Sequence, residues 1–232
     1  MGKLQSLKAD LHKLSNPEKA KLLQGFFKTG KGQYGEGDVF LGITVPETRK
    51  LAVKYKEIPL IQVKELIESR IHEERLLAVL ILVNKYQTTN DKNIVDFYKQ
   101  HNHKMNNWDL VDLSADKIIG KYYFNNKDKI KELYSLASSD NLWERRTSIV
   151  STYYFIKNNE FYNTINIAEI LLKDKHDLIQ KAVGWMLREV GKRDESVLKR
   201  FLNKYNKSMP RTMLRYSIEK LPEKERKYYL NK

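Results

Sequence analysis

The stretch NNWDLVDLSADK, Asn106–Lys117, contains a tryptophan followed by an acid, and this pair marks the repeat that predicts the fold. Trp108-Asp109 returns 35 residues later as Trp143-Glu144. A second pair, Glu74-Arg75, precedes Glu144-Arg145 by twice that interval, 70 residues. Each interval has room for about two helices, and helix pairs repeated at a fixed period are typical of an α-solenoid.

Helical periodicity continues on both sides of this stretch. Apolar residues recur at helical spacing in segment after segment, for example at Val111, Ala115 and Ile118, and few runs alternate as strands do. Two capping boxes with proline in the first turn, Ser15–Glu18 and Thr44–Glu47, predict that helices start there. We therefore predict an all-α fold, a single domain over residues 1–232, in which HEAT-like antiparallel helix pairs line a concave surface.

The charge balance indicates the kind of partner. The chain has 43 Lys and Arg residues against 29 Asp and Glu, a formal net charge of +14. From Arg188 to Lys232 there are 14 basic and 6 acidic residues, which is +8 of that total. An excess of this size is typical of proteins that bind a phosphate backbone. We expect the concave surface to be a basic cleft and its partner to be nucleic acid.

Other classes of protein are disfavoured by the composition. The chain has no cysteine, which excludes disulfides, thiolate catalysis and iron–sulfur clusters. The five histidines include one close pair, His101 and His103, without a carboxylate at ligand spacing, so we expect neither a metal nor another cofactor. No apolar run approaches the roughly 20 residues of a membrane helix, and the N-terminus lacks the apolar core of a signal peptide. We expect a cytoplasmic, nucleoid-associated monomer with no membrane partner.

One segment departs from the helical pattern. Thr29–Gly42 holds five of the ten glycines of the chain. Glycine lets backbone N–H groups approach an anion, so a phosphate-binding loop is one interpretation. The segment lacks the lysine–serine ending of a Walker motif and follows no strand, so we favour a flexible connection between helices.

Four residues combine the repeat with residue types suited to chemistry on nucleic acid. Trp108 and Asp112 are four residues apart and lie together at the edge of the predicted apolar stripe. Arg146 follows Trp108 by 38 residues, and Trp185 follows Arg146 by 39, close to one repeat each. If the second helix of every pair faces inward, these four side chains converge on the concave wall.

At these residues the sequence resembles the AlkD-like DNA alkylation repair glycosylases, a family built from HEAT-like repeats. The motifs are WDxVD at Trp108–Asp112, an element ending at Arg146, and KAxGWxLRE at Lys181–Glu189. The resemblance extends from Pro17 to about Gly191. It implies an enzyme whose cleft binds duplex DNA and excises positively charged N3- or N7-alkylated purines, without a base-binding pocket.

The resemblance also implies roles for individual residues. Asp112 corresponds to the catalytic carboxylate, and Trp108 and Trp185 to the aromatic walls that assist it. Arg146 corresponds to a clamp on a phosphate or on the DNA backbone, and the adjacent Arg145 and the Arg188 of the third motif are expected to bind DNA with it. Phe26 falls where some members have a tyrosine, so we expect it to bind DNA without the hydroxyl that would contact a phosphate.

Other tryptophans, acids and arginines of these motifs have simpler structural roles. We expect Trp143 to be a core residue, and Asp109 and Asp116 to be solvated or capping side chains. Arg145 and Arg146 could instead pair with Glu144 or with acids of a neighbouring helix.

Two other functions remain open at this stage. The first is a non-catalytic helical-repeat protein that binds damaged or branched DNA. The second is a protein-interaction scaffold, which the positive charge disfavours. Retention of Asp112 and both candidate wall tryptophans favours the enzyme over the non-catalytic protein.

Overall fold

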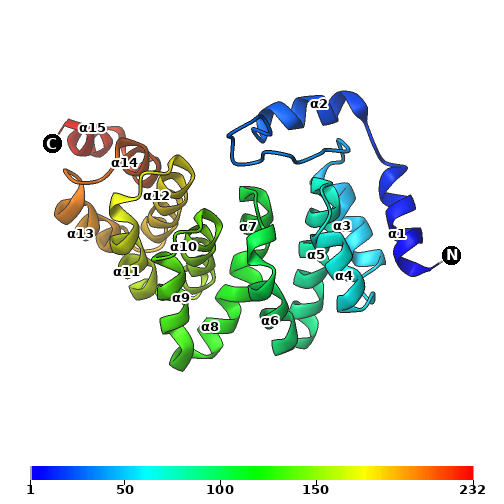
Figure 1. Ribbon diagram of the computed structural model, residues 1–232. Coiled ribbons are helices and arrows are strands. Elements are labelled where there is room, and N and C mark those ends of the chain that lie inside the picture. The colour runs from blue at the N-terminus through cyan, green and yellow to red at the C-terminus, as the bar shows by residue number, and fades with distance from the viewer. Residues whose placement is uncertain (1, 232) are drawn as a thin grey trace. The chain divides into compact units, whose positions relative to one another are not determined.

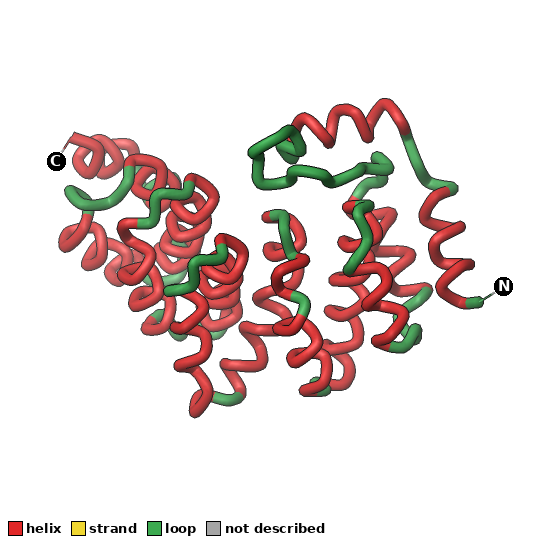
Figure 2. The backbone as a smooth tube through the Cα atoms, in the orientation of Figure 1, coloured by secondary structure: helices red, strands yellow, loops and turns green. Residues whose placement is uncertain are grey.

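The computed structural model describes residues 2–231, and the regular structure in this range is helical (Figure 2). Within those residues, one isolated parallel β-bridge joins Val39 and Ile71. The predicted all-α class is therefore confirmed for the described part of the chain.

The chain divides into two compact units, Met1–Ser114 and Ala115–Lys232. Figure 1 labels their helices in chain order. The first unit holds α1 (Lys3–His12), α2 (Pro17–Phe26), α3 (Val45–Lys54), α4 (Leu60–Ile67), α5 (His72–Thr89), α6 (Lys92–Gln100) and most of α7 (Trp108–Ala115). The second holds α8 (Lys121–Asn125), α9 (Ile130–Ala137), α10 (Leu142–Lys157), α11 (Tyr162–Ile170), α12 (Asp177–Gly191), α13 (Glu195–Tyr205), α14 (Arg211–Ser217) and α15 (Glu223–Asn231). A single domain over 1–232 stays a prediction.

The period inferred from the tryptophans appears in the helix starts. Five helices, α5, α7, α10, α12 and α14, begin at intervals of 34 to 36 residues. In the second unit α10 packs against α9 and α12 against α11, while α14 packs against α12, which also contacts α13. The long, buried members α10 and α12 pack on each other and form the centre of that unit.

The turns that precede these helices repeat as well. Ser69 and Ser139 each accept a hydrogen bond from the backbone N–H two residues later, and Asp174 does the same through its carboxylate. Arg75 and Arg145 each donate to the carbonyl of the serine six residues earlier, at 2.6 and 2.9 Å. The arginine of each repeated Glu-Arg pair thus donates a hydrogen bond to a serine carbonyl in the turn before its helix, a carbonyl that would otherwise lack a partner.

The two predicted helix starts are confirmed, with one change of cap. Thr44 and Glu47 form the expected capping box at the start of α3. Helix α2 does begin at Pro17, but its cap is Asn16, whose side chain accepts from Lys19 N at 3.0 Å. Ser15 lies one residue too early for this bond, and Asn is as good a cap as Ser.

The glycine-rich segment is pinned at its C-terminal end. The carboxylate of Glu73 accepts hydrogen bonds of 2.8 to 3.2 Å from the backbone N–H groups of residues 41–43. Gly42 has φ +81°, and a Cβ there would lie 2.2 Å from Asn16 O. The prediction of a flexible connection is therefore wrong for this end of the segment. The phosphate-binding alternative loses its donors there too, because an internal carboxylate already holds them.

Candidate active site

The first turn of α7 positions Trp108 against α2. Its backbone N–H donates to the side chain of Asn107 at 2.8 Å. The indole stacks on Phe27 with ring centroids 5.1 Å apart and meets the edge of Phe26 at 6.0 Å. Trp108 is half-buried, whereas Phe26 is 64% exposed. One face of the tryptophan is thus held by phenylalanines rather than by the helical core.

Asp112 lies one helical turn beyond Trp108 and is also half-buried. Its neighbours Val111 and Ala115 are fully buried, so α7 turns one face inward and carries Trp108 and Asp112 at the border of that face. Their predicted position at the edge of the apolar stripe is confirmed.

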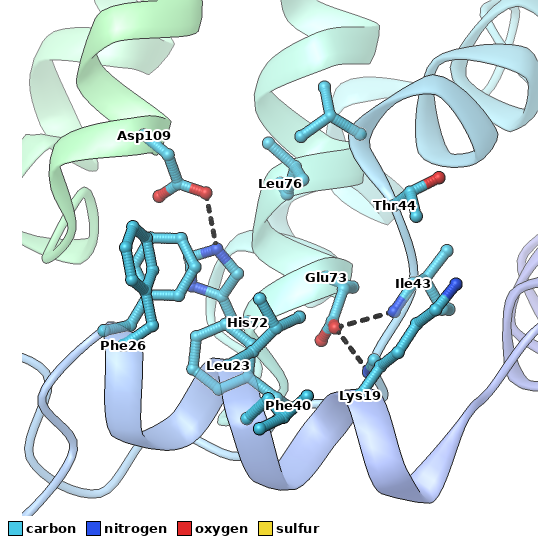
Figure 3. Close-up of a pocket in the computed structure, with 14 residues that line it drawn as sticks. Lys19, Leu23, Phe26, Phe40, Ile43, Thr44, His72, Glu73, Leu76 and Asp109 are labelled. Atoms are coloured by element: carbon cyan, nitrogen blue, oxygen red, sulfur yellow. Dashed lines mark hydrogen bonds and ion pairs between the residues drawn. The ribbon is translucent and has the colours of Figure 1, made fainter.

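Asp109 was expected to be solvated or to cap a helix, and this is wrong. It is 6% exposed, and its Oδ2 lies 2.8 Å from Nε2 of His72 at the start of α5 (Figure 3). Asp38, at the end of the glycine-rich segment, lies 3.7 Å from the other nitrogen of that ring and 2.5 Å from Arg75. The four side chains form a buried network of two acids and two bases.

The network keeps His72 protonated. Burial by itself lowers the pKa of His72, but the charge and hydrogen bond of Asp109, with a further contribution from Asp38, raise it to about 9. Burial also opposes ionisation of Asp38, yet its hydrogen bond to His72 and the charge of Arg75 leave the pKa of that carboxyl below its usual value. At neutral pH the network is therefore formally balanced and links α7 to α5 and to the segment before α3.

Asp116 was also expected to be solvated or capping, and this too is wrong. It is 2% exposed and lies 2.8 Å from both Lys117 and Lys157. It opens a π-helical turn, Asp116–Gly120, that packs on α10. A Cβ on Gly120 would lie 2.2 Å from Ser151 O, so glycine permits this close approach.

In the second unit, Trp185 lies half-buried on α12. Its ring centroid is 6.0 Å from that of Tyr153 on α10. Two cations flank the tyrosine, Lys157 at 5.0 Å and Arg193 at 5.9 Å from the ring centroid. Gly184, next to Trp185, lets α12 pack closely on α14, because a Cβ there would lie 2.5 Å from Tyr216 of α14. Sequence analysis had not singled out Tyr153, Lys157 or Arg193.

The predicted DNA-binding arginines make internal contacts. Arg146 is 5% exposed and donates to the carbonyl of Leu178 in the first turn of α12 at 2.5 Å. Arg145 pairs with Asp174 at 2.7 Å, in agreement with the alternative in which it binds a nearby acid. Arg188 pairs with Glu219. Their roles in DNA binding stay predictions, and these contacts limit how freely the guanidinium groups can reach a phosphate.

The remaining tryptophan behaves as expected. Trp143 is 7% exposed, and its prediction as a core residue is confirmed. Trp108 and Asp112 belong to the first compact unit, whereas Arg146 and Trp185 belong to the second. The convergence of these four residues on one wall stays a prediction.

Comparison with known families identifies the chain. A family model described as DNA alkylation repair enzyme matches residues 7–221. The chain belongs to this family. A search of curated proteins found no match.

Solved structures support the same fold for this family member. A predicted DNA alkylation repair enzyme from Enterococcus faecalis aligns with a TM-score of 0.73 at 19% identity, covering 90% of this chain and 97% of that one. AlkD2 from Streptococcus mutans aligns with a TM-score of 0.58 at 18% identity, covering 89% and 99%. The protein smu.31 from Streptococcus mutans UA159 gives 0.54 at 21%, covering 93% and 96%.

Among residues 2–231 of this DNA alkylation repair family member, no helix is long and apolar enough to cross a membrane. No group of three or more His, Cys, Asp or Glu side chains with the arrangement of a metal site occurs among the same residues.

Proposed function

We propose that this member of the DNA alkylation repair family is a DNA N-glycosylase that excises positively charged N3- or N7-alkylated purines from duplex DNA. The observation that carries the proposal is the pairing of Asp112 with Trp108, both partly exposed one turn apart on α7, in a chain with a net charge of +14. An acid beside a phosphate backbone weakens binding, so its placement at a DNA-binding surface favours a role in chemistry.

Alkylation of the base removes the need for an acid catalyst. Its positive charge has already weakened the bond between the base nitrogen and C1′ of the deoxyribose. As that bond breaks, its electron pair stays on the nitrogen and neutralises the base, so the leaving group needs no proton. Positive charge then develops on the sugar, and a water oxygen forms the new bond to C1′ while losing its proton.

Asp112 is suited to that positive charge. A carboxylate about 4 Å from a cation, at an effective dielectric constant near 20, stabilises it by about 4 kcal/mol, or on the order of a thousandfold in rate. The same carboxylate can accept the proton of the attacking water. The face of Trp108 adds cation–π attraction of roughly 2 kcal/mol where water is excluded.

The second unit supplies further support for DNA binding. Trp185 and Tyr153 offer aromatic surface, and Lys157 and Arg193 place positive charge beside it. We propose that these residues and Arg146 belong to one basic concave cleft of a HEAT-like array. The repeated helix starts and repeated turns described above support that architecture. We further propose that the protein acts as a monomer, in the cytoplasm and associated with the nucleoid.

Release of base from duplex DNA that carries a single 7-methylguanine tests the proposed function. Purified protein in excess over DNA should release the base much faster than the same duplex does alone. A matched duplex with unmodified guanine should release none above background. Tight, salt-sensitive binding to the modified duplex without release would instead identify a non-catalytic DNA-binding protein.

A further inference from the structure

A buried ion pair lies next to the candidate site in the first unit. Asp109 follows Trp108 on α7, and its Oδ2 lies 2.8 Å from Nε2 of His72 on α5. Both members of the pair are buried. A hydrogen bond between charged partners in such surroundings is strong and directional. The pair therefore ties the first turn of α7 to the first turn of α5.

A second contact ties the same end of α7. Asn106, two residues before the helix, donates from Nδ2 to Oδ1 of Asp38 at 3.0 Å. The other oxygen of Asp38 lies 2.5 Å from Arg75 and 3.7 Å from the imidazole of His72. Both contacts of α7 thus lead to one network, which is carried by α5 and by the end of the glycine-rich segment.

Stacked rings also connect His72 with Trp108. The centroid of the Phe27 ring lies 5.1 Å from that of Trp108 and 5.2 Å from that of His72, and both pairs are stacked. Phe40 stacks on the same imidazole at 4.4 Å. His72 is therefore linked to Trp108 by two routes, along α7 from Asp109 and across the ring of Phe27.

Packing by itself constrains this region incompletely. A cavity of about 280 Å³ lies between α2, α5 and α7, and its lining includes Phe27, His72 and Asp109 (Figure 3). Side chains beside such a space make van der Waals contacts on fewer sides. The hydrogen bond to Asp109 then has a larger share in fixing how α7 is rotated about its axis.

The rotation of α7 determines where Trp108 and Asp112 point. Successive residues of an α-helix are about 100° apart, so these two lie about 100° and about 60° from Asp109 in the same direction round the helix. Holding Asp109 inward therefore places both of them together. A rotation of about 10° would move side-chain atoms that lie about 5 Å from the axis by roughly 1 Å. Misplacement by about 1 Å can slow catalysis on the order of a hundredfold.

We propose that Asp109 and His72 are positioning residues for excision, which hold Trp108 and Asp112 at the angle that the reacting sugar requires. The inference rests on the proposed function, because that function gives Trp108 and Asp112 their roles. Asp109 and His72 are buried, so they act through the residues that they hold and not on the DNA itself. Breaking the pair should therefore lower the rate of excision more than the affinity for duplex DNA.

A double substitution separates positioning from stability. Asp109→Leu alone would leave His72 buried without its main partner, and that is strongly destabilising. His72→Phe together with Asp109→Leu removes both charges and leaves the pair of Asp38 and Arg75 in place. Apolar replacement of a buried ion pair at similar volume is often neutral for stability. The double variant should fold, yet single-turnover excision of 7-methylguanine at saturating protein should fall about 10- to 100-fold.

Glu74→Leu is the matched control. Glu74 is a buried acid of the same helix, but it pairs with Lys8 and His12 of α1 and not with α7. Its replacement should lower the free energy of unfolding and leave excision by the folded protein nearly normal. Asp109→Asn keeps an acceptor for the imidazole and should excise faster than the double variant. Normal excision by the double variant, or a loss no larger than that of Glu74→Leu, would overturn the proposal.

The accessibility of Trp108 provides a readout that needs no excision. Trp143 is 7% exposed, so in a Trp185→Phe background the quenching of fluorescence by acrylamide reports mainly on Trp108. The double variant should change this quenching, and Glu74→Leu should not. A changed quenching in a protein that excises nothing would support the positioning of Trp108 and refute the proposed function. Excision by the natural protein, with quenching and rate unchanged in the double variant, would refute the positioning alone.

Discussion

Helices α7 and α10 begin with the same pattern, a tryptophan followed by an acid, and use it differently. In α10, Trp143 is buried and Glu144 accepts from the Ser139 hydroxyl in its own turn. In α7, Trp108 is half-exposed, and Asp109 reaches a histidine 37 residues away. At α7 the end of α2 places Phe27 against the indole, and α5 places His72 against Asp109. The same pair of residue types therefore serves the core in α10 and contributes to the candidate site in α7, because different side chains surround it.

The two tryptophans provide the largest test of this comparison. Trp143→Ala should lower the free energy of unfolding by about 3–5 kcal/mol, as expected for removal of a buried aromatic side chain, and leave excision by the folded fraction nearly normal. Trp108→Ala should destabilise less and reduce excision more. Urea unfolding and single-turnover excision on both variants check this. Equal losses of stability with equal activities would show that the two positions are equivalent.

Asp112 is the next test, because it lies one turn after Trp108 where α10 has the buried Thr147. Asp112→Asn should reduce single-turnover excision of 7-methylguanine by roughly 10² to 10³, the effect of removing one well-placed electrostatic group. Affinity for duplex DNA should stay equal or rise, since a repulsion from phosphate is removed. Asp128→Asn, at an exposed acid of the second unit, is the control and should behave normally. Normal excision by Asp112→Asn would assign Asp112 a structural role.

The His72 network, which has no counterpart at the start of α10, predicts that the free energy of unfolding depends on pH. The pKa of His72 is raised in the folded state to about 9, from 6.5. Its stabilisation is therefore complete below about pH 6.5 and is lost as the pH rises through 9, a decline of roughly 3 kcal/mol. Urea unfolding between pH 6 and 9.5 measures it. His72→Gln should remove most of this decline, and an unchanged profile in that variant would refute the assignment.

Arginines of α10 offer the smallest test. If Arg146 neutralises one phosphate, Arg146→Ala should weaken duplex binding and reduce the slope of log affinity against log salt by about one unit. Arg145→Ala is the neighbouring comparison: Arg145 pairs with Asp174, so we expect a smaller change in slope than for Arg146→Ala. Equal slopes for Arg146→Ala and the natural protein would remove Arg146 from the interface.

Local patterns were sufficient for much of the fold. Helical periodicity, the Thr44 capping box and the 35-residue interval predicted helices that the structure contains, because each depends on neighbours within a few turns. The same reasoning failed for Asp109 and Asp116. Isolated aspartates are most often solvated, but His72, which binds Asp109, lies 37 positions away, and Lys157, one of the two lysines that pair with Asp116, lies 41 positions away.

The sequence by itself determined the helical class, the repeat, the basic character and the motif that pairs Trp108 with Asp112. Only the tertiary structure decided that Trp108 stacks on Phe27, that Asp109 is held by His72, and that a cavity remains beside them. Helix formation follows short-range periodicity, which a sequence displays directly. Ion pairs and cavities depend on how distant side chains pack, and that packing is a property of the folded chain as a whole.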